Sequence, residues 1–272
     1  MVRRQFIRQA VSLGATTGIA LLVGHWPGQG SQPAEPSTGG AGPDASDETD
    51  RSGTAESDGG DAPTGHDGGT EPSGPVTLRD GDSGEAVLAL QRRLGDLGYW
   101  CGTPDAYYGG LTAQAVTALQ KVAGLTRDGI AGPATAQALA AGTRPSASTY
   151  SGHVIEIHRD TQVLLIVDSG RVGMILATCT GSEIPYKSRG RTWSARTTPG
   201  SFHVYLSKDG WDHGPLGDLW RPMFFNGGIA VHGSTSVPPY PASHGCCRLT
   251  IPAMDMILER GLITIGTPVV VS

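Results

Sequence analysis

The chain has 272 residues, of which 17% are charged, and a formal net charge of −5 at pH 7. Residues 28–75 contain ten Asp and Glu residues and one Arg, which leaves a charge of +4 on the rest of the chain. This distribution excludes a strongly basic, nucleic-acid-binding protein. The length is sufficient for one or two domains with hydrophobic cores.

The N-terminus has the features of an export signal. Arg3 and Arg4 precede a mostly apolar stretch over residues 10–24. A bilayer-spanning helix needs about 20 apolar residues, so we expect residues 1–27 to be a cleaved signal that meets the membrane only during export. The run Arg-Arg-Gln-Phe-Ile-Arg resembles a twin-arginine signal, and an ordinary secretory signal is the alternative.

Residues 28–75 contain no Val, Ile, Leu, Met, Phe, Trp or Tyr. Such a segment cannot bury enough apolar surface to offset its ordering entropy. We therefore expect a flexible, acidic Gly/Ser/Pro linker between the signal and the folded part of the chain.

Residues 76–145 are predicted to form a small three-helix domain. The first helix starts near Glu85, with Asp82 as its cap, and has apolar residues at helical spacing up to Leu97. A second helix is expected over residues 112–123, and Pro133 suits the first turn of a third.

An internal repeat runs through this segment. Asp, Gly, Thr and Ala recur with an offset of 23 residues, from Asp105, Gly109, Thr112 and Ala115 to Asp128, Gly132, Thr135 and Ala138. Each unit is interpreted as a glycine-containing loop, a Thr cap and a short helix. Together with the Leu-Gln pairs at residues 90–91 and 119–120, this pattern resembles the peptidoglycan-binding domain type 1 family. The resemblance implies binding to the bacterial cell wall; a helical spacer without a ligand is the alternative.

Residues 150–272 are predicted to be mostly β. Apolar runs at residues 154–157, 163–167 and 171–178 indicate strands, the last two joined by the turn Asp-Ser-Gly. Further strands are expected at residues 202–206 and 269–271, and a minor helix at 252–260.

The chemistry concentrates around Ser243-His244-Gly245-Cys246-Cys247. A nucleophilic cysteine needs a base, and His232 ends an apolar strand that would hold it rigidly. Gly245 permits a tight turn, so successive backbone N–H groups beside Cys246 would face an oxyanion. Two alternatives remain: a zinc site built from the His and Cys residues, and a structural disulfide, which is the default for cysteines of an exported protein.

The motif is similar to the signature of the L,D-transpeptidase (YkuD-type) family. The resemblance rests on His232-Gly233, on Ser-His-Gly-Cys followed by Arg248, on Thr-Pro-Gly at residues 198–200 and on Gly-Thr-Pro-Val at 266–269. It covers residues 150–272 and implies a β-sandwich-like fold with a minor helix. It also implies transpeptidation of a peptidoglycan stem peptide.

The family roles are carried over residue by residue as expectations. Cys246 is the nucleophile, His232 its general base, and Gly233 orients that histidine through its carbonyl oxygen. The oxyanion and support positions are Ser243, His244, Gly245 and Arg248. The residues expected to line the substrate groove are Trp220, Met223, Phe225 and Asn226. Cys247 departs from the pattern, which usually has an aliphatic residue there.

The resemblance implies no metal and no cofactor. The expected partners are peptidoglycan stems and glycan, with carbapenem β-lactams as inhibitors, and a monomer is expected in the cell wall or outside a bacterium. A catalytically silent wall-binding protein and an L,D-carboxypeptidase with water as acceptor are the alternatives. The acceptor, the diamino acid and the pairing of Cys101, Cys179 and Cys247 stay open.

Overall fold

The computed structural model describes residues 76–272. The expected export signal (1–27) and acidic linker (28–75) lie outside the described residues. Among residues 76–272, no helix has the length and apolar character needed to span a membrane.

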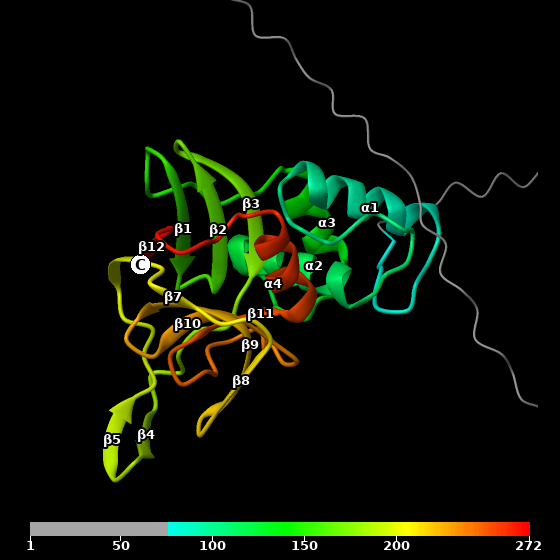
Figure 1. The fold of residues 1–272 in the computed structure, drawn as a ribbon. Coiled ribbons are helices and arrows are strands. Elements are labelled where there is room, and N and C mark those ends of the chain that lie inside the picture. The colour runs from blue at the N-terminus through cyan, green and yellow to red at the C-terminus, as the bar shows by residue number, and fades with distance from the viewer. Residues whose placement is uncertain (1–75) are drawn as a thin grey trace, which may run out of the picture. The chain divides into compact units, whose positions relative to one another are not determined.

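Three helices occupy the first part of the described chain: α1 Glu85–Asp96, α2 Gly110–Ala123 and α3 Pro133–Ala140 (Figure 1). Val87, Leu90 and Leu94 are buried, as the helical spacing predicted. The predicted cap is wrong. Gly84 caps α1, whereas Asp82 accepts a hydrogen bond from the N–H of Arg79 at 2.8 Å and closes the preceding turn.

Each half of the sequence repeat is organised by a buried glutamine. The side-chain amide of Gln91 donates to Asp105 Oδ1, Tyr107 O and Thr112 Oγ1 at 2.8–3.0 Å. Gln120 repeats this pattern, with the acceptors Asp128 Oδ1, Ile130 O and Thr135 Oγ1. The prediction that the two threonines are helix caps is therefore wrong. They lie inside α2 and α3, where their hydroxyl groups accept these hydrogen bonds. In each half of the repeat, one glutamine thus connects the loop to the helix that follows it, α2 for Gln91 and α3 for Gln120.

The remaining residues form two five-stranded sheets, a separate hairpin and one helix, which confirms the mostly β fold after a helical segment. The first sheet has the order β3-β2-β1-β12-β6, and β12 runs parallel to β1. Its strands are β1 His153–His158, β2 Val163–Asp168, β3 Arg171–Ala177, β6 Gly200–His203 and β12 Pro268–Val271.

The second sheet has the order β11-β10-β9-β7, with β8 also paired to β9. Its strands are β7 Leu206–Ser207, β8 Trp211–Gly214, β9 Gly217–Asn226, β10 Ile229–Ser234 and β11 Cys247–Thr250. The strand predicted over residues 202–206 is in fact two strands, because β6 pairs with β12 in the first sheet and β7 with β9 in the second. The hairpin of β4 Pro185–Ser188 and β5 Arg191–Ser194 projects from the body, and α4 Ile251–Glu259 follows β11 (Figure 1).

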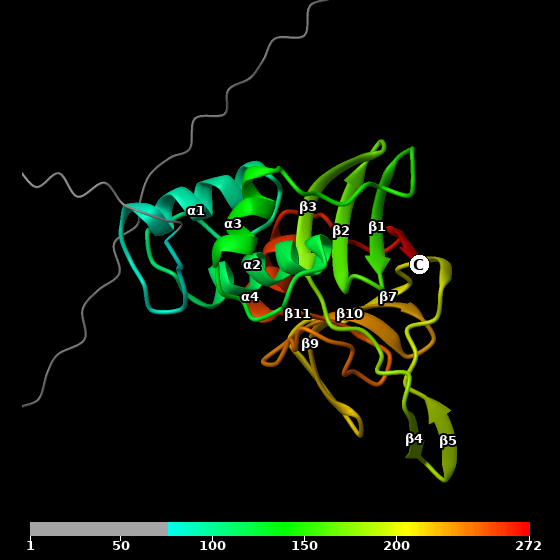
Figure 2. The same ribbon diagram turned by 180° about the vertical axis from the view of Figure 1, so that it is seen from behind.

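Strand β2 explains how the helices and the sheets are joined. It is buried at five successive positions, so both of its faces are covered. Leu164 and Ile166 pack into the core between the two sheets. Val163, Leu165 and Val167 share a second core with the helices. Figure 2 shows α2 beside β3 of the same sheet. One continuous apolar run thus serves two hydrophobic cores.

A buried lysine lies where α2 meets the first sheet. Lys121 Nζ donates to Gln162 O at 3.1 Å and to Thr178 O at 2.8 Å. Burial, together with the nearby charge of Arg127, lowers the pKa of Lys121 to about 7. The contact between helix and sheet therefore contains an amine that titrates near neutral pH.

Candidate active site

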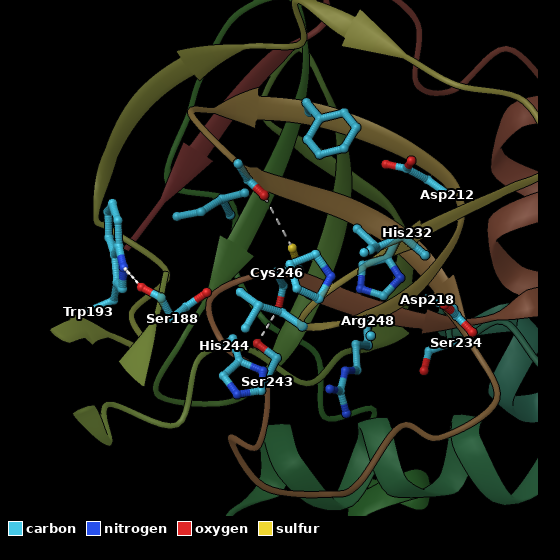
Figure 3. Close-up of a pocket in the computed structure, with 18 of the residues that line it drawn as sticks. Ser188, Trp193, Asp212, Asp218, His232, Ser234, Ser243, His244, Cys246 and Arg248 are labelled. Atoms are coloured by element: carbon cyan, nitrogen blue, oxygen red, sulfur yellow. Dashed lines mark hydrogen bonds between the residues drawn. The ribbon is translucent and has the colours of Figure 1, made fainter. Parts of the chain in front are cut away.

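A groove of ≈ 1130 Å³ opens on the second sheet. Its floor includes residues of β9, β10 and the segment before β11. The two hairpins β4–β5 and β8–β9 contribute Trp193 and Trp211 to its lining. Figure 3 shows Trp193 among the labelled residues around Cys246. Cys246 and His232 both line this groove, so the fold brings together the two side chains predicted to act as nucleophile and base.

Cys246 follows a sharp turn immediately before β11. Gly245 has φ 136°, a backbone conformation that favours glycine, and a Cβ there would lie 3.1 Å from Arg196 O. The Cys246 thiol is 3.7 Å from Gly228 O. Burial raises the pKa of this thiol, against the opposing effects of a hydrogen bond from Ala230 and the charge of Arg248. The thiol is therefore protonated at neutral pH.

Cys247 points the other way. It is fully buried in the core between the sheets, as the alternation of side chains along an extended segment predicts. All four cysteines in residues 76–272 are free thiols. The same residues contain no group of three His, Cys, Asp or Glu side chains that could hold a metal ion. Because Cys247 faces the core, it cannot join Cys246 in one zinc site.

His232 lies on β10 with only 4% of its surface exposed. Its Nδ1 is 2.8 Å from Gly233 O. A carbonyl oxygen can only accept, so Nδ1 carries the proton and Nε2 keeps its lone pair. Burial lowers the pKa of His232 to about 4, with a smaller contribution from the charge of Arg248. The imidazole is therefore neutral at pH 7.

The neighbours of Gly233 leave no space for a larger residue at this position. A Cβ at this position would lie 2.8 Å from Cδ1 of Trp220 and 3.2 Å from the Cβ of Met254. The indole of Trp220 is fixed in turn by a 2.8 Å hydrogen bond to Asp255 Oδ1. The carbonyl that engages His232 thus belongs to a tightly packed strand.

The register of β10 and β11 explains why Arg248 lines the same groove. The strands are parallel, with His232 opposite Arg248 and Val231 opposite Cys247. The first pair faces the groove, and the second pair faces the core. The charge of Arg248 lowers the pKa values of both Cys246 and His232.

The residues before Cys246 have distinct contacts. Ser243 Oγ donates to Cys246 O at 2.6 Å and accepts the N–H of Gly245 at 3.0 Å. The Gly245 N–H is thus occupied, which leaves the N–H groups of His244 and Cys246 as candidates for binding an oxyanion. His244 is exposed, and its ring contacts Tyr186 of β4 edge-on, with ring centroids 4.6 Å apart.

The predicted groove lining needs a correction. Met223 and Phe225 are buried in the core, and Trp220 packs against it. Of the four predicted residues, only Asn226 lines the groove, and Phe224, which was not predicted, lines it as well. Side chains alternate along a strand, so an error of one residue exchanges the two faces. Trp193, Trp211 and Asp212 were also missed, because no local pattern shows which hairpins approach a site distant in sequence.

Comparisons with known proteins agree with this arrangement. The L,D-transpeptidase catalytic domain model matches residues 152–271, and a peptidoglycan binding domain model matches residues 83–139. The crystal structure of an L,D-transpeptidase from Xylanimonas cellulosilytica DSM 15894 is 48% identical, with a TM-score of 0.71. This match covers 74% of the present chain and 100% of the other.

Two curated N-acetylmuramoyl-L-alanine amidases match a shorter stretch. CwlL of Bacillus licheniformis is 52% identical over 66 residues, or 24% of this chain and 18% of the amidase. CwlM of Mycobacterium tuberculosis is 43% identical over 56 residues, or 21% and 14%. The chain thus spans less than a fifth of either amidase. By its match along the whole crystallised Xylanimonas chain, which is residues 123–326 of that protein, and by its two family domains, the chain belongs to the L,D-transpeptidase family, and it carries a peptidoglycan-binding domain together with the catalytic domain.

Proposed function

We propose that this cell-wall L,D-transpeptidase is exported and acts through a thioester on Cys246. The Cys246 sulfur attacks the carbonyl carbon of the stem-peptide bond to D-Ala, and His232 Nε2 takes the thiol proton. The C–N bond then breaks, and His232 returns the proton to the leaving amine of D-Ala. An acceptor amine attacks the thioester, loses its proton to His232, and releases the Cys246 thiol.

The contact between His232 Nδ1 and Gly233 O is the observation that carries this proposal. With the proton held on Nδ1 by Gly233 O at 2.8 Å, only Nε2 is available as a base. The raised pKa of Cys246 and the lowered pKa of His232 favour a neutral thiol–imidazole pair before substrate binds. The proton would then move as the sulfur attacks, and the positive charge of Arg248 would stabilise the thiolate.

Three further assignments belong to the same proposal. The segment 76–145 acts as the wall-binding domain of an exported chain, beside the catalytic domain 150–272. The acceptor is an amine, so the enzyme forms crosslinks or anchors, whereas water as acceptor would make it an L,D-carboxypeptidase. Carbapenem β-lactams would acylate Cys246, because their strained carbonyl presents the same target to the thiol.

Mass spectrometry of the intact chain tests the proposal. The protein is mixed with a carbapenem or with a tetrapeptide stem, and peptide mapping locates the adduct. We expect one acyl group on Cys246 and none on the buried thiols of Cys101, Cys179 and Cys247. A second arm adds a stem with a free side-chain amine and compares crosslinked with hydrolysed product. A chain that binds peptidoglycan but never acquires an acyl group would instead be a silent wall-binding protein.

A further inference from the structure

Residues 195–197 pass between two glycines next to the candidate nucleophile. A Cβ on Gly181 would overlap Ala195 O, and it would lie 2.8 Å from Thr197 N. On the other side, a Cβ on Gly245 would lie 3.1 Å from Arg196 O. The absence of both side chains lets this segment contact the turn that precedes Cys246.

The hydroxyl of Thr197 joins the two glycines. It accepts the N–H of Gly181 at 2.9 Å and donates to Gly245 O at 2.6 Å. Thr197 is fully buried, and its branched Cβ restricts the rotamers of the side chain. The donor on Gly245 O is therefore held in one direction.

That direction determines the orientation of a neighbouring group. Gly245 C=O and Cys246 N–H belong to one planar trans peptide, in which the two bonds point in opposite directions. Holding the oxygen toward buried Thr197 therefore turns the N–H of Cys246 away from it. Ser243 binds the groups on either side, the N–H of Gly245 and the carbonyl of Cys246, but not this N–H.

We propose that Thr197 is a positioning residue that orients the N–H of Cys246 as an oxyanion donor. This inference rests on the proposed acyl transfer at Cys246. When the sulfur attacks a carbonyl, the carbonyl oxygen becomes negative, and a donor already aimed at it stabilises that charge. In this role Thr197 contacts neither the substrate nor the Cys246 sulfur; the thiol that its side chain contacts is the buried one of Cys247. It acts through the plane of the Gly245–Cys246 peptide.

Two reactions of the same thiol separate this role from a general effect on folding. Acylation by a carbapenem passes through an oxyanion, whereas alkylation by iodoacetamide does not. We expect Thr197→Val to slow acylation of Cys246 by about 10- to 100-fold, somewhat less than the loss of a complete oxyanion donor. Alkylation should stay within about twofold of the parent rate, and Thr197→Ser should restore acylation because it keeps the hydroxyl.

Thr178→Val is the matched control. Thr178 is equally buried and donates to a backbone carbonyl after the nucleophile, Arg248 O at 2.9 Å. Its ratio of acylation to alkylation should equal that of the parent. If Thr197→Val does not fold, Thr197→Ala is judged by the same ratio. An unchanged ratio in the folded Thr197 variant, or a parallel fall of both rates, would overturn the proposal. A parent chain that alkylates but never acylates would refute the proposed function instead.

Discussion

The helical segment and the groove both bury polar side chains, but in different ways. In the helical segment, Gln91 uses both atoms of its amide: the nitrogen has three acceptors, and the oxygen accepts the N–H groups of Asp105 and Ala106. In the groove, His232 uses one ring nitrogen to orient itself and keeps the other free. A buried polar group with all its bonds made rigidifies a structure, whereas one with an open atom is available for chemistry.

The pKa values of buried groups also differ between the groove and the helical segment. Burial moves the pKa of His232 to about 4 and raises that of Cys246. Perturbed groups that face a common groove are candidates for function. A neutral glutamine has no charge to lose, so its burial affects stability alone. The comparison therefore predicts that changes in the groove reduce activity and changes at the glutamines reduce stability.

The largest effect is expected in the groove. Cys246→Ala and His232→Ala should each reduce acyl transfer by about 10³-fold or more, and the double variant should be scarcely worse, because the two residues act as one unit. Melting temperatures should change little relative to this loss. Steady-state turnover of a stem peptide and thermal unfolding provide the measurements. Near-normal turnover by either single variant would refute the assignment.

A substitution at Gln91 should show the opposite pattern, with a loss of stability and little change at the groove. Gln91→Leu removes five hydrogen bonds made by one buried amide, so we expect a loss of about 3 kcal/mol and a melting temperature lower by roughly 6–12 °C. Alkylation of Cys246 below the transition should be unchanged. Gln137→Leu on α3 is the control, because Gln137 is exposed. If Gln91→Leu melts like the parent, the comparison of the two regions is wrong.

Lys121 should make the stability of the folded chain depend on pH. Its pKa is about 7 in the folded chain and near 10.5 when unfolded, so between these values the unfolded chain holds a proton that the folded chain has released. Stability from this group therefore rises with pH by up to about 1.4 kcal/mol per unit.

Lys121→Met removes this titration, so the parent should gain melting temperature relative to the variant between pH 7 and 8.5. The comparison with the variant matters, because unfolded cysteine thiols begin to ionise near pH 8.5 and oppose the effect. Differential scanning fluorimetry at several pH values measures it. A difference between the two proteins that is independent of pH would show that the lysine does not titrate in this range.

The smallest effect is expected at Cys247. Cys247→Val replaces a buried thiol by a side chain of similar volume, so the cost should stay below about 1.5 kcal/mol. Acylation of Cys246 should persist, and melting should be the same in reducing and non-reducing buffer. Loss of the acyl adduct at an unchanged melting temperature would place Cys247 in the chemistry.

The sequence by itself determined the features that depend on local patterns. Apolar spacing predicted α1 and α2, and the turn Asp-Ser-Gly predicted the hairpin of β2 and β3. The motif around Cys246 identified the residues that the fold gathers in one groove with His232. These features can be recognised without the fold because helix and strand periods, and short motifs, are properties of neighbouring residues.

Only the tertiary structure decided what depends on distant contacts. It divided residues 202–206 between two sheets and turned Phe224, rather than Phe225, toward the groove. It also brought Thr197 against Gly245, 48 residues later. A strand can present either face to a core, and the choice follows from packing against partners far away in the chain. For that reason the motif around Cys246 was visible in the sequence, while the contact of the Thr197 hydroxyl with Gly245 was not.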